Sequence, residues 1–179
     1  MTTLVVARGR ALSALKAGDC PSPSINGAPA IVGRSDDASG LVMLTGDFGR
    51  ERKRPHVGPP SADLIVLSRS GPDFAATPAA LSGDPARPAM VAALDRDASG
   101  APVFNRQGEL AGVVAPIDDD PKRVARVALI APHAIIGADA LRSFLAPNET
   151  TGDPAAAQKS AGAIAADEKD AVVAVDCGR

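Results

Sequence analysis

The sequence predicts an all-β protein, an antiparallel sandwich or barrel, and three observations support this fold class. Short apolar or alternating runs recur along the first 132 residues, each bounded by Gly, Pro, Asp or Ser. The 17 glycines and 16 prolines supply turns between these runs. Helical spacing of apolar residues appears only after them. The runs lie at residues 3–7, 28–33, 40–44, 62–68, 89–94, 101–104, 109–116 and 124–132.

Length and composition narrow the possible functions. A chain of 179 residues can form one compact unit with a tail. A net charge of −2, four Phe and the lack of Tyr and Trp argue against a nucleic-acid-binding protein. No apolar run approaches the roughly 18 residues of a membrane span, and residues 1–20 do not resemble a secretory signal.

The last third of the chain departs from the strand pattern. Apolar residues at helical spacing predict one closing helix near residues 133–146. The small and polar composition of residues 147–170 indicates a linker, within which 163–170 could form a helix. Residues 171–179 contain a final apolar run at 171–177, and a strand there requires a partner sheet.

Candidate chemistry centres on Ser99, in the turn Asp-Ala-Ser-Gly-Ala-Pro. The same four letters DASG also occur at residues 37–40, so the turn alone does not identify a nucleophile. Two Cys and two His at wide spacing match no zinc pattern, and no phosphate-binding glycine motif precedes a helix. The acidic run at 118–123 is typical of a solvated hairpin turn. The basic cluster at 50–54 is typical of a solvated connection, or alternatively of a patch on which an anionic partner docks. The sequence therefore predicts no metal and no cofactor.

The block ASGAPVFNRQGELAGVV at residues 98–114 resembles the nucleophile region of the chymotrypsin- or trypsin-like serine proteases, in particular their bacterial HtrA-like branch. The serine, the glycine and proline after it, and the apolar pattern around Gly108 and Gly112 match in order and spacing. The resemblance covers residues 3–146 and implies a double six-stranded antiparallel β-barrel. It divides the chain into an N-terminal barrel at 1–54, incomplete at its start, and a C-terminal barrel with the closing helix at 55–146.

The same resemblance assigns the positions of the catalytic triad. The histidine position falls on Leu15 and the aspartate position on Gly40, so that only Ser99 remains. A serine hydroxyl is a poor nucleophile without an imidazole base that a carboxylate orients. The oxyanion region comprises Asp97, Ala98 and Ser99. Asp97 stands at the position where the family has glycine. Its carboxylate would repel a developing oxyanion.

Neither histidine of the chain falls at the position of a base. His56 lies in the predicted connection between the barrels, and His133 precedes the predicted helix. A dyad of Ser99 with His56 would require that connection to fold back.

The resemblance also implies a role for the C-terminal run. The chain starts too late to contain the family's first strand, and residues 171–177 resemble it. We expect them to fill the vacant position, within the same chain or by exchange in a homodimer, with Cys177 near Cys20. A disulfide there implies an oxidising compartment, periplasmic or secreted. The alternative is a disordered tail with two free thiols.

Three functional interpretations follow. The first is an inactive trypsin-like homologue that binds a peptide or a partner protein. The second is an active serine endopeptidase with nucleophile Ser99 and a non-standard base. The third is an unrelated all-β interaction domain with a chance Ser-Gly turn.

Overall fold

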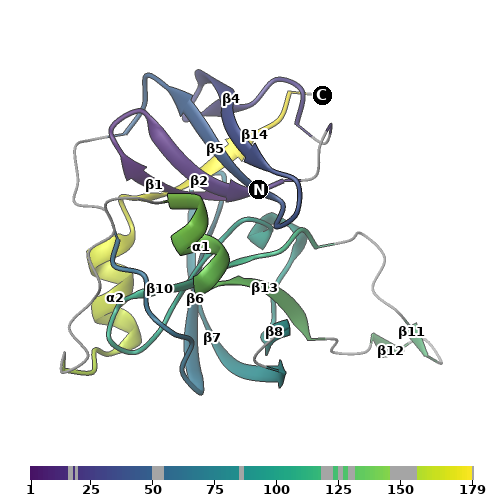
Figure 1. Ribbon diagram of the computed structural model, residues 1–179, viewed down its shortest axis with the longest axis vertical. Coiled ribbons are helices and arrows are strands. Elements are labelled where there is room, and N and C mark those ends of the chain that lie inside the picture. Colours follow the sequence, from purple (N-terminus) through teal and green to yellow (C-terminus); the bar gives the residue numbers. More distant parts are fainter. Residues whose placement is uncertain are drawn as a thin grey trace.

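Two closed six-stranded antiparallel barrels make up most of the protein, as the computed structural model in Figure 1 shows. The structure describes residues 1–15, 18, 20–49, 55–84, 87–117, 123–124, 127–128, 132–145 and 157–178. The basic cluster at 50–54 and the acidic residues 118–120 lie outside the described residues. The predicted double six-stranded barrel is confirmed.

The first barrel combines the two ends of the chain. Its hydrogen-bonded order is β1-β14-β3-β4-β5-β2, and β2 closes onto β1. Strand β14 pairs antiparallel with β1 on one side and β3 on the other. The strands are β1 (Thr2–Ala7), β2 (Arg10–Ala14), β3 (Ser24–Ile25), β4 (Ala28–Asp36), β5 (Leu41–Gly46) and β14 (Val172–Asp176).

The second barrel has the order β10-β13-β8-β7-β6-β9. The two barrels share one topology when β14 is counted as the first strand of its barrel. If the strands of each barrel are then numbered from one to six, they follow the same order, 1-4-5-6-3-2, around both barrels. The strands are β6 (Asp63–Ser70), β7 (Asp73–Asp84), β8 (Arg87–Val91), β9 (Pro102–Phe104), β10 (Leu110–Val114) and β13 (His133–Gly137), with a separate hairpin of β11 (Arg123–Val124) and β12 (Val127–Ala128).

The closing helix is present, but it is shorter than predicted. Helix α1 spans Ala138–Leu145, and His133–Gly137 forms the last barrel strand. Residues 133–137 form a strand because Ile135 is buried against β10. Gly112 of β10 leaves room for this side chain, since a Cβ on Gly112 would lie 2.2 Å from it. The predicted strand at 124–132 is represented only by the short β11–β12 hairpin among the described residues.

The predicted linker at 147–170 contains a second helix, α2 (Ala161–Glu168). The Ser160 hydroxyl accepts a hydrogen bond from the Ala163 amide at 3.1 Å and caps its N-terminus. Residues 146–156 lie outside the described residues. None of the helices in the described ranges is long and apolar enough to cross a membrane.

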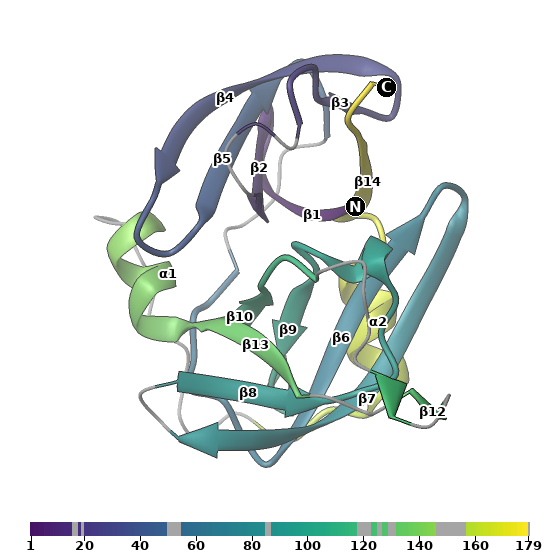
Figure 2. The ribbon, with the colours of Figure 1, turned by 90° about the vertical axis from the view of Figure 1, so that its right-hand side faces the viewer.

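The barrels are joined by a shared apolar core. One cluster of buried side chains includes Leu4 and Leu12 of the first barrel with Ile65 and Phe104 of the second, and Leu141 of α1 closes it. Figure 2 shows the first barrel above the second, with α1 and the β1–β14 pair at the junction. This junction positions the candidate site.

Candidate functional site

A cavity of about 1000 Å³ lies between the barrels, and we call it the interbarrel cavity. Leu15 and the β3–β4 turn line it from the first barrel, and Asp97 and Ser99 line it from the second. The end of β14 and the two residues that follow it, together residues 174–178, form a further wall. The C-terminal segment therefore helps to shape the cavity that contains the candidate nucleophile.

The Ser99 hydroxyl is engaged by backbone. Its Oγ accepts a hydrogen bond from the Ile117 amide at 3.0 Å, and the Ser99 residue is only 3% exposed. A catalytic serine instead donates its proton to a base while its oxygen attacks the substrate. An amide bound to that oxygen occupies one of its lone pairs and offers no acceptor for the proton.

The positions assigned to the base and its carboxylate are adjacent in space but carry no such groups. The Leu15 amide donates a hydrogen bond to the Gly40 carbonyl at 3.1 Å, and both residues line one cavity. Leu15 is 6% exposed and packs among apolar side chains. Among the described residues that line the interbarrel cavity there is no histidine, and His56 and His133 are not part of its wall.

The oxyanion region forms a short 3-10 turn, η1 (Arg96–Ala98), and the amides of Ala98 and Ser99 donate within this turn. The Ser99 amide donates to the Arg96 carbonyl at 3.0 Å, and the Ala98 amide donates to the Asp95 carbonyl at 3.1 Å. The Asp97 carboxylate accepts a hydrogen bond from the Ser70 hydroxyl. An oxyanion hole requires free donors that point at one position. Here the Ala98 and Ser99 amides donate to carbonyls of the turn itself instead.

The turn around Ser99 also holds the barrels together. The Thr2 amide donates to the Ser99 carbonyl at 3.0 Å, and the Thr2 hydroxyl donates to the Asp97 carbonyl at 2.7 Å. Gly100 has φ +78°, and a Cβ there would lie 2.2 Å from Ser13 Oγ and 2.5 Å from the Thr2 carbonyl oxygen. Glycine at position 100 is therefore required by a contact between the barrels, independently of any chemistry.

A second cavity of about 510 Å³ adjoins the first. The turn from Asp36 to Gly40 forms one side, and the Ser39 hydroxyl donates a hydrogen bond to the Asp36 carboxylate at 2.5 Å. This hydrogen bond holds the pKa of Asp36 below its usual value. The carboxylate is therefore anionic at neutral pH.

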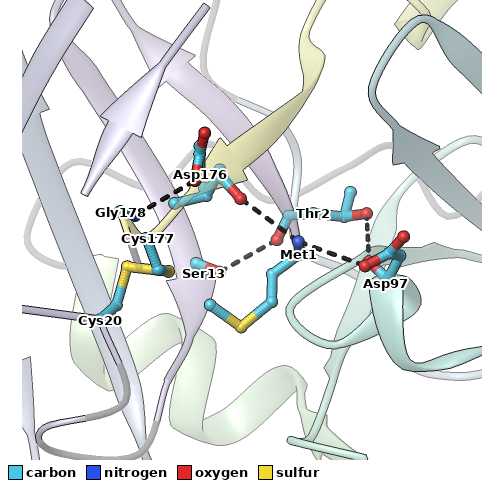
Figure 3. The surroundings of a disulfide bond; sticks show 9 residues. Met1, Thr2, Ser13, Cys20, Asp97, Asp176, Cys177 and Gly178 are labelled. Atoms are coloured by element: carbon cyan, nitrogen blue, oxygen red, sulfur yellow. Dashed lines mark hydrogen bonds and ion pairs between the residues drawn. A yellow bond between two sulfur atoms is a disulfide. The ribbon is translucent and has the colours of Figure 1, made fainter. Parts of the chain in front are cut away.

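Cys20 and Cys177 form a disulfide across 157 positions of the sequence. Figure 3 shows the disulfide on one side of Met1 and of Thr2, the first residue of β1, with Asp97 on the other side of these two residues. The bond ties the end of β14 to the segment that follows Leu15. Cys177 lines the interbarrel cavity and Cys20 lines the second cavity.

The structure brings together Ser99, Leu15 and Gly40 of the sequence-predicted site, and it adds residues that the sequence did not indicate. Ile117 was missed because its contact with Ser99 depends on how the chain turns after β10. Thr2 was missed because a threonine in a strand carries no signal of a contact between barrels. The described residues contain no cluster of three potential metal ligands.

The chain resembles solved structures in fold. The protease domain of MamO from Magnetospirillum magneticum, in its apo form, superposes with a TM-score of 0.59 and 15% sequence identity. The match covers 80% of this chain and 86% of that domain. No protein-family model and no curated protein sequence matches the chain. The similarity supports a trypsin-like double-barrel fold.

Proposed function

We propose that the protein is a catalytically inactive member of the trypsin-like fold that binds a peptide or a segment of a partner protein in the interbarrel cavity. The observation that carries the proposal is the hydrogen bond from the Ile117 amide to Ser99 Oγ. This bond engages the Ser99 oxygen with a donor, and Leu15, at the position assigned to the base, supplies only an apolar surface to the cavity.

The oxyanion region supports the same conclusion. Acyl transfer requires a nucleophile, a base and stabilisation of the oxyanion, and removing the nucleophile or the base of a triad costs roughly as much rate as removing the whole triad. The Ser99 amide is bonded within η1, and Asp97 places a carboxylate beside it. The cavity of about 1000 Å³ is nevertheless present, and it supports a role in binding a ligand.

A peptide-binding experiment tests the proposal. The purified chain is applied to an array of nonapeptides in a Gly-Ser frame that carries every pair of amino acids at two central positions. We expect a subset to bind and to remain uncleaved by mass spectrometry. An Ala174→Trp variant places an indole in the cavity wall and is expected to abolish binding.

The matched control is Ala75→Trp, on an exposed position of β7 away from the cavity. It should bind as the parent chain does. Equal binding by the Ala174→Trp variant would contradict the proposed location. Cleavage of the peptides, lost in Ser99→Ala, would contradict the proposed inactivity.

We further propose that the protein belongs to the bacterial HtrA-like branch and works in an oxidising compartment, periplasmic or secreted. The block at residues 98–114 supports the first statement, and the Cys20–Cys177 disulfide supports the second. Protein isolated from its natural source under alkylating conditions should contain no free thiol. Two alkylated cysteines in that sample would contradict this assignment.

Exchange of β14 between two copies is a second way to close the first barrel. In the structure β14 belongs to the same chain as its neighbours. Exchange would place Cys20 and Cys177 of different copies in one disulfide. Non-reducing electrophoresis would then show a covalent dimer that reductant converts to monomer.

A further inference from the structure

The two cavities adjoin at two shared side chains. Leu15 and Pro116 line both of them, so a chain bound in the interbarrel cavity reaches the second cavity by crossing these two side chains. The second cavity is therefore a continuation of the peptide-binding site, and its chemistry bears on which peptides bind.

The wall of the second cavity is largely apolar. Leu41, Val42 and Cys20 contribute buried side chains to it, and Val32 of β4 lies at the cavity while remaining 49% exposed. Covering an exposed valine releases water from apolar surface and favours an aliphatic ligand. A volume of about 510 Å³ is ample for one such side chain.

The charges of the two cavities differ. The interbarrel cavity carries both signs, from Arg69, Arg96, Asp97 and Asp176. Among the described residues that line the second cavity, Asp36 and Asp37 are the charged ones, and both are carboxylates. The side chain of Asp37 is exposed at the cavity. A cation brought there meets complementary charge, whereas an anion is repelled.

We propose that the second cavity selects peptide segments in which an aliphatic residue adjoins a lysine or arginine, the aliphatic side chain entering the cavity and the cation lying at the Asp36 and Asp37 carboxylates. This inference rests on the proposed binding function and gives it a specificity. A free amine alone lacks the apolar part, and a purely apolar peptide brings no cation to the two carboxylates.

The peptide array described above provides the test, followed by fluorescence anisotropy of the best peptides. The parent chain should prefer pairs that combine Leu, Ile or Val with Lys or Arg. An Asp37→Lys variant should weaken these peptides about five-fold and shift the preference toward Glu and Asp. Asp63→Lys, an exposed carboxylate on β6 outside both cavities, is the matched control.

A second pair of variants tests the apolar part. Val32→Thr keeps a branched strand residue but removes apolar surface, and it should weaken aliphatic-containing peptides about three-fold. Val91→Thr, on a valine of β8 that is 41% exposed and lines neither cavity, is its control. Both variants should melt within a few degrees of the parent chain, so that altered binding is not a folding effect.

The outcomes separate this inference from the function on which it rests. If peptides bind and Ala174→Trp abolishes binding, while Asp37→Lys and Val32→Thr change nothing, the specificity is wrong and the binding function stands. A preference for acidic pairs in the parent chain would also overturn the specificity. If no peptide of the array binds, both proposals fail.

Discussion

Replacement of Gly100 by alanine tests whether the Ser-Gly turn is held by the contact between barrels. Gly100 has φ +78°, and left-handed backbone costs an alanine about 1–2 kcal/mol. The new Cβ would overlap Ser13 Oγ and the Thr2 carbonyl oxygen, and overpacking typically costs about 1–3 kcal/mol. Rotating the buried Ser13 hydroxyl away would break its 3.0 Å hydrogen bond to Thr2, at about 1–3 kcal/mol more. We therefore expect a loss of about 3–8 kcal/mol in the free energy of unfolding.

Gly40→Ala is the matched control. Gly40 has φ +75°, but a Cβ there would meet nothing within 4 Å. Only the backbone strain of about 1–2 kcal/mol remains. Urea denaturation followed by far-UV circular dichroism measures both variants, since the chain lacks Trp and Tyr for intrinsic fluorescence. Equal destabilisation by the two substitutions would refute the argument that packing between the barrels requires Gly100.

Two further predictions concern the links that hold the fold. The Cys20→Ser/Cys177→Ser double variant removes a cross-link spanning 157 positions, so its free energy of unfolding should fall by up to about 5 kcal/mol in urea titrations; an unchanged midpoint would contradict a formed disulfide. Arg34 donates a hydrogen bond to the Phe144 carbonyl at 2.8 Å and lies 4.7 Å from the centre of its ring, which joins β4 to α1. Arg34→Ala should therefore cost about 1–2 kcal/mol, whereas an effect no larger than that of Arg87→Ala, on an exposed strand position, would show that this link contributes little.

The sequence predicts the strands whose apolar side chains are buried in the core, because these strands appear as short apolar runs. The runs at 62–68 and 109–116 correspond to β6 and β10, whose apolar side chains are buried. The twelve residues of β7 were missed, because most of them are exposed and most are alanine or polar, so that they give no alternating apolar signal. Residues 133–137 were assigned to a helix because Ile135 and Ile136 continue the spacing of Leu141. In the structure they extend along β10 and β8 instead.

The candidate site was predictable only in part. The resemblance placed Leu15 and Gly40 at neighbouring catalytic positions, and the structure joins them by a hydrogen bond. It could not indicate that the Ile117 amide reaches Ser99, because this contact is set by tertiary structure. Nor could it show that Gly100 packs against β1 and β2. The glycine of a turn that looks catalytic in sequence is here explained by packing between the barrels.

Reaction with a fluorophosphonate tests the central claim most directly, because such a probe bonds only to an activated serine. The intact chain is incubated with the probe and examined by mass spectrometry, with an active trypsin-like protease treated in parallel. We predict no adduct on this chain, since Ser99 Oγ is bonded to the Ile117 amide and Leu15 stands at the position of the base. Stoichiometric labelling at Ser99 that Ser99→Ala abolishes would contradict the account.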